Sequence, residues 1–346
     1  MFDSDVHPLT DGSGQEKTRA GRNRTLTTQP SERQTLRHRM IDPASIEGLN
    51  FLGKTVFGDC FDAFNRMPNK VVDLLILDPP YNLNKKFGAR AFSRMPVEQY
   101  TNWIRDLLRA VRPKLKDSAT VYICGDWLSS ASIFSAASEF FVVRNRIAWE
   151  REKGRGALTN WKNSSEDIWF CTVSDSYTFN VDAVKLRRRV IAPYRHADGR
   201  PKDWQETEAG NFRDTHPSNL WTDITIPFWS MPENTDHPTQ KSEKFIAKLI
   251  LASSNPGDVV FDPFLGSGTS SVVAKKLDRQ FSGVEIDETY ALLAEKRLAL
   301  AEHDESIQGY RDKVFWERNT LKVQNGSKSK SGDGLPFADM LLPFEE

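Results

Sequence analysis

The chain has 346 residues, 38% of them hydrophobic and 27% charged, and its 47 basic and 47 acidic residues cancel. This is the balance of a soluble protein with one large domain or two modest ones, and it leaves nucleic-acid binding open because a local basic face suffices. No apolar run is long enough to span a bilayer, and the N-terminal residues lack the apolar core of a signal peptide. Cys60, Cys124 and Cys171 show no metal-binding spacing, so we expect buried, reduced thiols in a cytoplasmic protein.

Residues 1–45 contain few large apolar side chains and many Ser, Thr, Gln, Arg and Gly residues. Such a segment cannot bury enough apolar surface to fold by itself, so we expect a disordered basic leader. Between positions 17 and 39, seven Lys and Arg residues face a single acid, Glu32. This charge is compatible with a weak nucleic-acid arm, although a solvated tail is the simpler interpretation. Met40 is an alternative start that the sequence leaves open.

Short apolar runs alternate with helical patterns from residue 51 onwards. Runs rich in β-branched and aromatic residues predict strands at 55–61, 71–78, 119–125, 140–149, 166–173, 258–266 and 281–287. Apolar residues between Val97 and Val111 recur at helical spacing, and Pro113 limits the end of that helix. The alternation favours a three-layer, Rossmann-like α/β fold with a largely parallel sheet.

Residues 182–235 depart from this alternation, because they are polar and interrupted by Pro and Gly. We expect an irregular insertion there instead of more sheet. Between 185 and 213, eight basic residues face four acids, which favours contacts with nucleic-acid phosphates. The residues to which we assign this role are Arg187, Arg188, Arg189 and Arg195. Residues 319–346 include NGSKSKSGDG and predict a flexible tail.

A glycine-rich segment, FDPFLGSGTSS, follows a predicted strand and opens a helical pattern. Gly266 and Gly268 permit a tight turn and close approach of the backbone to a ligand, while Ser267 and Thr269 can cap the helix. Taken alone, such glycines are as compatible with an ordinary turn as with a ligand site. The segment lacks the lysine of a P-loop, which disfavours ATP bound in that manner.

The next predicted strand ends in GVEID. Glu285 at this position can accept hydrogen bonds from ribose hydroxyls, whereas capping of the following helix suffices to explain Asp287. The glycine-rich turn and the acid after the next strand together indicate a cofactor that contains adenosine.

The stretch LLILDPPYN ends another strand of the same kind, and ligands of open α/β sheets bind at the carboxyl ends of strands. The Asp78 carboxylate and the Pro79 carbonyl can accept the two hydrogens of an exocyclic amino group. Proline holds its carbonyl rigidly, and the ring of Tyr81 offers a surface on which a planar base can stack. The motif therefore predicts recognition of the amino group of a nucleobase.

In this order, DPPYN, HPTQK, DPFLGSGTS and GVEID resemble the motifs of the S-adenosylmethionine-dependent DNA amino-methyltransferases. The DPPY motif begins 184 residues before the acid of the glycine-rich motif, which is similar to the permuted, beta-group order of that family. The resemblance covers roughly residues 52–300. It implies a mostly parallel sheet with an antiparallel strand and a target-recognition region at 182–235. The catalytic half would then be 46–181 and the cofactor-binding half 236–318.

The resemblance also implies site residues. The catalytic set is Asp78, Pro79, Pro80 and Tyr81. The set that binds S-adenosyl-L-methionine is Asp59, Cys60, Asp78, His237, Thr239, Gln240, Lys241, Asp262, Pro263, Phe264, Gly266, Ser267, Gly268, Thr269, Glu285 and Ile286. No metal is implied. Ser165–Glu166 stands where many relatives carry a His-Glu pair, which leaves a base-contacting role at this position open.

A motif that begins with Asp goes mostly with adenine N6 in this family, and one that begins with Ser goes with cytosine N4. We therefore expect a site-specific adenine-N6 methyltransferase that flips its target out of double-stranded DNA. Cytosine-N4 methylation and a catalytically idle DNA-binding protein are the alternatives. The resemblance implies a bacterial, archaeal or phage protein in a restriction-modification or orphan setting. Any endonuclease would be a separate chain, and a homodimer is left open.

Overall fold

The computed structural model of the chain describes residues 21–87, 90–151, 158–190, 194–207, 210–320 and 324. Its centre is an eight-stranded sheet with the order β1-β13-β12-β2-β5-β7-β6-β11. The bounds of these strands are β1 Lys54–Phe57, β2 Val72–Leu77, β5 Leu115–Gly125, β6 Val142–Glu150, β7 Ser165–Thr172, β11 Leu220–Trp221, β12 Val259–Asp262 and β13 Gln280–Glu285. Only β7 runs antiparallel to its neighbours in this sheet, which confirms the predicted mostly parallel arrangement.

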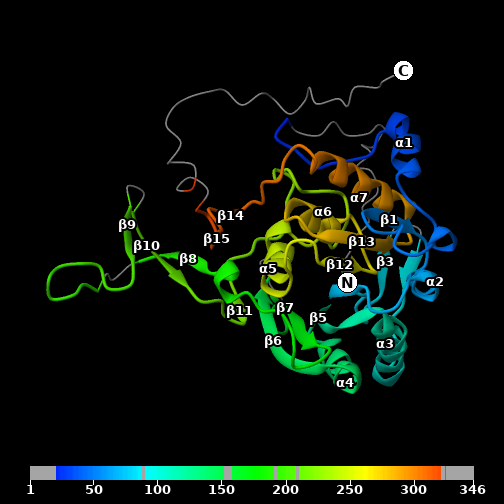
Figure 1. Cartoon of the computed structure of the whole chain (residues 1–346), viewed down its shortest axis with the longest axis horizontal. Coiled ribbons are helices and arrows are strands. Elements are labelled where there is room, and N and C mark those ends of the chain that lie inside the picture. The colour runs from blue at the N-terminus through cyan, green and yellow to red at the C-terminus, as the bar shows by residue number, and fades with distance from the viewer. Residues whose placement is uncertain are drawn as a thin grey trace.

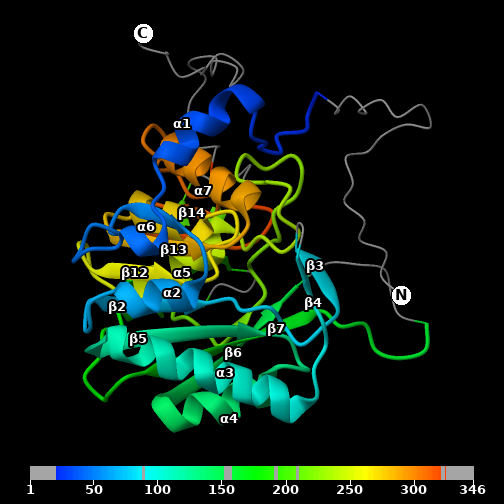
Figure 2. The same cartoon turned by 90° about the vertical axis from the view of Figure 1, so that its right-hand side faces the viewer.

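Helices cover both faces of the large sheet (Figures 1 and 2). They are α2 Cys60–Arg66, α3 Val97–Val111, α4 Ser130–Phe140, α5 Glu243–Ser253, α6 Thr269–Lys276 and α7 Glu288–Leu300. Alternate residues of β2 point to opposite faces: Leu74 and Ile76 pack with α5 and α6, and Leu75 and Leu77 pack with α2, α3 and α4. The predicted three-layer fold is therefore confirmed. Among the described residues, no helix is long and apolar enough to cross a membrane.

The ends of several strands differ from the sequence prediction. The predicted strand 55–61 ends at Phe57, because Asp59 accepts a hydrogen bond from the backbone N–H of Phe61 and starts α2. The predicted strand 281–287 ends at Glu285, because Asp287 caps α7. A capping side chain stabilises the first turn of a helix, so in both places it ends the strand earlier than apolar periodicity suggests.

The sequence predicted an irregular insertion at residues 182–235, but the structure forms regular strands there. These residues contribute three strands of a second sheet, with the order β14-β15-β8-β10-β9 (Figure 1). The bounds are β8 Leu186–Arg189, β9 Gln205–Thr207, β10 Gly210–Thr215, β14 Tyr310–Arg311 and β15 Val314–Trp316. Strands β8, β9 and β10 are short and largely polar, so they lack clear alternation, and β8 gains a parallel partner, β15, from residues more than a hundred positions away.

The smaller elements complete the chain. They are the hairpin of β3 Lys85–Phe87 and β4 Arg90–Phe92, helix α1 Arg33–His38, and 3-10 turns at Pro30–Glu32, Pro43–Ser45, Arg112–Lys114 and Val181–Val184. The disordered leader expected over 1–45 is wrong for residues 21–45. Leu36 and Met40 are buried against Ala291 and Leu292 of α7. Residues 1–20 and, within the predicted tail 319–346, residues 321–323 and 325–346 lie outside the described residues.

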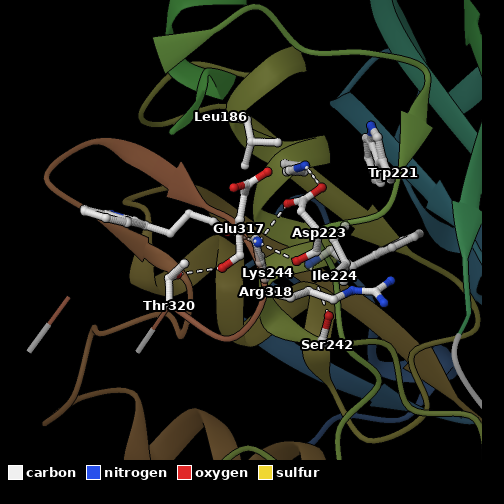
Figure 3. A network of polar contacts seen from close by, with 12 residues as sticks. Leu186, Trp221, Asp223, Ile224, Ser242, Lys244, Glu317, Arg318 and Thr320 are labelled. Atoms are coloured by element: carbon white, nitrogen blue, oxygen red, sulfur yellow. Dashed lines mark hydrogen bonds and ion pairs between the residues drawn. The ribbon is translucent and has the colours of Figure 1, made fainter. Parts of the chain in front are cut away.

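A buried cluster of charges joins the second sheet to α5 (Figure 3). The Asp223 carboxylate lies 2.7 Å from the ammonium nitrogens of both Lys244 and Lys248. Lys244 also donates to the backbone carbonyl of Trp316 on β15, and the Lys248 ammonium lies 4.9 Å from the centre of the Trp221 ring. Burial of Lys244 lowers its pKa to about 8 despite Asp223. The cluster therefore places two cations and one carboxylate at the junction of α5 and the second sheet.

We predict that Asp223→Ala lowers the free energy of unfolding by about 3–5 kcal/mol, because it leaves two buried ammonium groups without their carboxylate. Asp198→Ala is the matched control, since Asp198 pairs with the exposed Arg200 and its loss should leave the unfolding midpoint nearly unchanged. Urea unfolding of the two variants measures the difference. Equal shifts of the two unfolding midpoints would contradict the anchoring role of Asp223.

Candidate active site

Four neighbouring strands end at one edge of the large sheet, and each ends at or just before an acid that the sequence singled out. In the order of the strands β1, β13, β12 and β2, these acids are Asp59, Glu285, Asp262 and Asp78. The strands are parallel, so their carboxyl ends meet at the same edge. The sheet therefore brings together motifs that are more than two hundred residues apart in the chain.

Asp78, Tyr81 and Lys241 form a polar cluster at the end of β2. The Lys241 ammonium donates to Asp78 Oδ2 at 2.7 Å and to the Tyr81 hydroxyl at 3.2 Å. The Tyr81 hydroxyl donates to Asp78 Oδ1 at 3.0 Å. Burial opposes the charge of Lys241, but Asp78 and Glu166 outweigh burial and hold the pKa of Lys241 above its usual value. The sequence assigned Lys241 to the cofactor; the structure pairs it with the DPPY carboxylate.

Glu166 on β7 is a site residue that sequence reasoning left open. Its side chain is buried, and its Oε2 lies 3.1 Å from the Tyr81 hydroxyl and 3.3 Å from the Lys241 ammonium. Arg151 pairs with its other oxygen. Burial, Asp78 and Glu166 all raise the pKa of Tyr81, so the phenol stays protonated and remains a donor. The glutamate in the Ser165–Glu166 pair was the available sequence signal, and the absence of the usual histidine weakened it.

The glycine-rich turn connects β12 to α6 as predicted. Gly266 and Gly268 have φ angles of +57° and +84°, which L side chains rarely adopt. A Cβ on Gly268 would lie 2.6 Å from the Cβ of Ala294, so that position also requires glycine for packing. Gly268 is itself the N-cap residue, and neither Ser267 nor Thr269 caps α6 through its side chain. The Thr269 hydroxyl donates instead to the carbonyl of Lys241 at 3.1 Å.

Two buried acids flank this turn. Glu285 accepts the backbone N–H groups of Gly266 and Asp287, both at 2.7 Å. Asp262 accepts the hydroxyl of Ser270 at 2.5 Å and the N–H of Phe264 at 3.0 Å. Burial raises the pKa of both carboxyl groups to about 7, although these hydrogen bonds oppose the shift.

The HPTQK segment lies over the glycine-rich turn. A Cβ on Gly266 would lie 3.0 Å from His237 Nε2, and the His237 ring packs edge-on against Tyr290 of α7. Gln240 donates to the carbonyl of Glu233 at 2.6 Å and accepts from Thr235. One cavity is lined by Ile76, Asp78, Cys124, His237, Thr239, Gln240, Lys241, Ile246, Asp262, Phe264, Leu265, Gly266, Ser267, Thr269 and Ser270. The cavity thus joins three of the four motifs.

Some predicted site residues lie elsewhere. Asp59 caps α2 and lines a second hollow with residues of the 42–44 turn, while Cys60 is buried beside it.

Tyr100 donates to the carbonyl of Pro80 at 2.9 Å, so this carbonyl of the DPPY motif already has a hydrogen-bond partner within the fold. The predicted DNA-binding residues Arg187, Arg188 and Arg189 lie on β8 in the second sheet, whereas Asp78 follows β2 of the large sheet.

The family model described as "DNA methylase" matches residues 72–296, which is more than half of the chain. The chain belongs to the DNA methylase family. It is 31% identical over 256 residues to the DNA adenine methyltransferase YhdJ of Escherichia coli, covering 72% of this chain and 83% of that protein. It is 30% identical over 265 residues to the type II methyltransferase M.BglII of Bacillus subtilis, covering 74% and 71% of the two chains.

The fold of this family member is also similar to a solved structure. The cytosine-N4-specific PvuII DNA methyltransferase aligns with a TM-score of 0.53 and 15% identity, covering 72% of this chain and 90% of that one. At this identity the likeness shows a shared fold and does not identify the target base. The match confirms the family that the sequence motifs indicated, whereas the permuted motif order and the roles of the individual site residues stay predictions.

We predict that the two buried acids make the protein less stable as the pH rises. Their folded-state pKa values of about 7 lie above the ordinary values of 3.8 and 4.5, so the folded protein binds more protons than the unfolded chain between about pH 4 and 7. Stability from these groups is therefore lost as the pH rises through that window. Melting temperatures of the wild type and of Asp262→Asn/Glu285→Gln between pH 5 and 8 test this: the wild type should lose stability relative to the variant. A difference that does not change with pH would contradict it.

Proposed function

We propose that this DNA methylase is a site-specific adenine-N6 methyltransferase, which transfers the methyl group of S-adenosyl-L-methionine to the amino group of an adenine flipped out of duplex DNA. The observation that carries the proposal is the position of the Asp78–Tyr81 motif. Asp78 and the glycine-rich turn line the same cavity. Lys241 contacts both, because its ammonium donates to Asp78 and its carbonyl accepts from Thr269. A base-binding motif and a cofactor-binding motif thus face one another.

The residues present suit S-adenosyl-L-methionine. The carboxylates of Asp262 and Glu285 flank the glycine-rich turn, and an acid after the next strand is suited to ribose hydroxyls. The HPTQK segment closes over the turn from the other side, so His237 and Gln240 would hold the methionine end. When bound, the cofactor supplies an electrophilic methyl group on a positively charged sulfur.

The catalytic cluster can exchange one hydrogen bond for another as the base enters. Lys241 holds Asp78 through Oδ2, which leaves Oδ1 facing the Tyr81 hydroxyl. An incoming amino group needs Oδ1, and the hydroxyl has Glu166 as an alternative acceptor at 3.1 Å. Asp78 Oδ1 and the Pro79 carbonyl would then accept the two amino hydrogens and localise the nitrogen lone pair. As the new nitrogen–carbon bond forms, the sulfur–methyl bond would break with its electron pair going to sulfur, and one amino hydrogen would leave as a proton, which Asp78 is placed to accept. Positioning and electrostatics would supply the rate enhancement.

Adenine is favoured over cytosine by the chain's own motif and its relatives. The motif begins with Asp78, and one relative is named a DNA adenine methyltransferase. The fold does not discriminate, since the PvuII enzyme is cytosine-N4-specific. Sequencing of modified bases in DNA from cells that express the chain tests the proposal. N6-methyladenine at one recurrent sequence is expected; N4-methylcytosine would establish the alternative, and unmodified DNA would favour an idle DNA-binding protein.

The proposed target-recognition region is residues 182–235, which supply β8, β9 and β10 to the second sheet, and β14 and β15 complete that sheet. Arg187 forms a two-bond ion pair with Asp214, with distances of 2.7 and 2.8 Å, so its guanidinium charge is partly neutralised within the second sheet. Arg189 is exposed, and phosphate contact by Arg188, Arg189 and Arg195 stays our prediction. The proposal includes a cytoplasmic location. Any partner endonuclease would be a separate chain.

We predict that Asp78→Asn lowers methyl transfer by about 10²-fold or more, since losing a positioned acceptor typically costs this much. Binding of S-adenosyl-L-methionine, measured by calorimetry, should change by less than about threefold. The amide keeps the volume beside Lys241, and Glu166 still pairs with the Lys241 ammonium at 3.3 Å, so misfolding is not expected. Activity above about one hundredth of the wild-type rate would remove Asp78 from the catalytic role.

We predict different outcomes for two substitutions of Tyr81. Tyr81→Phe keeps the stacking ring and frees Asp78 Oδ1, so methylation should stay within about tenfold of the wild type, whereas Tyr81→Ala should lose most of it because base stacking is worth roughly 1–3 kcal/mol. Single-turnover methylation of duplex DNA measures both. Equal losses would show that the hydroxyl, and not the ring, is what the reaction needs.

A further inference from the structure

An N-terminal strap, residues 24–27, pairs with the loop that leads into the HPTQK motif. The N–H of Arg24 donates to the carbonyl of Trp229 at 2.6 Å, and the N–H of Leu26 donates to the carbonyl of Asn234 at 2.8 Å. The side-chain amide of Asn234 donates to the Thr25 hydroxyl at 2.8 Å. Leu26 and Thr235 form a parallel β-bridge. The strap is therefore paired with this loop in the manner of a short strand.

Helix α7 holds the other side of the strap. The Lys296 ammonium donates to the carbonyl of Thr27 at 2.8 Å and to Glu32 at 2.7 Å. Just beyond, α1 lies beside α7 in both views (Figures 1 and 2), with Leu36 buried against it. The strap thus connects α7 to the loop, and its position does not depend on the loop alone.

Thr235 connects the strap to the HPTQK motif through hydrogen bonds. Its N–H and its hydroxyl both donate to Gln240 Oε1, at 2.9 and 2.6 Å. Its hydroxyl oxygen also accepts from the N–H of His237 at 3.2 Å. His237 in turn lies against Gly266. A short path of contacts therefore runs from Leu26 through Thr235 to the two residues proposed to hold the methionine end of the cofactor.

The loop needs such support because it has little regular structure of its own. Residues 229–242 contain only turns, bends and the single bridge at Thr235. Turns of this kind open more easily than packed strands and helices. If only a fraction of molecules hold the loop in the competent form, the apparent dissociation constant rises by the inverse of that fraction.

We propose that the strap is a positioning element of the cofactor site, which fixes residues 233–241 in the conformation that binds S-adenosyl-L-methionine. The inference rests on the proposed function. It makes the strap part of the site, although the strap lies outside the matched residues 72–296. Loss of the strap should weaken cofactor binding and leave the chemistry at Asp78 unchanged.

Two pairs of variants test the strap. Deletion of residues 1–28 removes it, and deletion of residues 1–20 is the matched control that retains it. Leu26→Pro removes the N–H that bonds to Asn234, and Leu26→Ala keeps that N–H while shortening the side chain. The readouts are the dissociation constant for S-adenosyl-L-methionine by calorimetry and a comparison of KM for the cofactor with kcat on duplex DNA.

We expect the 1–28 deletion to weaken cofactor binding by about tenfold or more, and Leu26→Pro by about threefold or more, with both controls within about twofold. KM for the cofactor should rise in parallel while kcat at saturating cofactor stays within about twofold. A merely structural role would lower the active fraction and kcat without a selective change in KM.

The outcomes separate this inference from the proposed function. A wild type that binds the cofactor, with Leu26→Pro indistinguishable from Leu26→Ala, overturns the strap's role alone. A wild type that does not bind S-adenosyl-L-methionine overturns the proposed function and this inference with it. If the longer deletion does not fold, the Leu26 pair decides the question, because both of its members keep the full chain.

Discussion

The ion pair between Lys241 and Asp78 is the interaction on which the site depends. The two residues are 163 positions apart, and each belongs to a different motif. Both lie in a largely buried setting, where a charge left without its partner is costly, so the pair fixes the distance between the DPPY turn and the HPTQK segment. It also fixes which Asp78 oxygen faces the Tyr81 hydroxyl. The chemistry proposed for the cluster follows from that asymmetry.

A second buried cation extends the same arrangement to the glycine-rich turn. Arg297 of α7 donates to the carbonyl of Ser267 at 3.0 Å, to the Thr269 hydroxyl at 2.8 Å and to Glu243 at 3.0 Å. Glu243 begins α5, three residues after Gln240. One guanidinium therefore holds the turn, the start of α5 and α7 together. Because its donors are directed in a fixed plane, a lysine would not supply the same set of contacts.

Helix α5 connects the site with the second sheet. It begins just after Lys241, and all eleven of its residues are buried. Its N-terminal end contacts the glycine-rich turn through Glu243 and Arg297, while Lys244 and Lys248 bind Asp223 and the β15 strand at the side that faces the second sheet. The proposed recognition surface and the proposed catalytic cluster are thus both attached to α5, so this helix sets their relative orientation.

The sequence by itself determined the layered α/β fold, the largely parallel sheet, the family and the motifs at the strand ends. These follow from local information: apolar periodicity within short segments, and turn residues at fixed spacing. Only the tertiary structure decided the contact of Glu166 with Tyr81, the pairing of Arg187 with Asp214, the mixed origin of the second sheet and the strap at residues 24–27. Each of these depends on contacts between residues far apart in the chain. A polar segment such as 21–45 lacks the apolar pattern of a core element, yet backbone hydrogen bonds and two buried side chains, Leu36 and Met40, hold it on the protein because its partners are already in place.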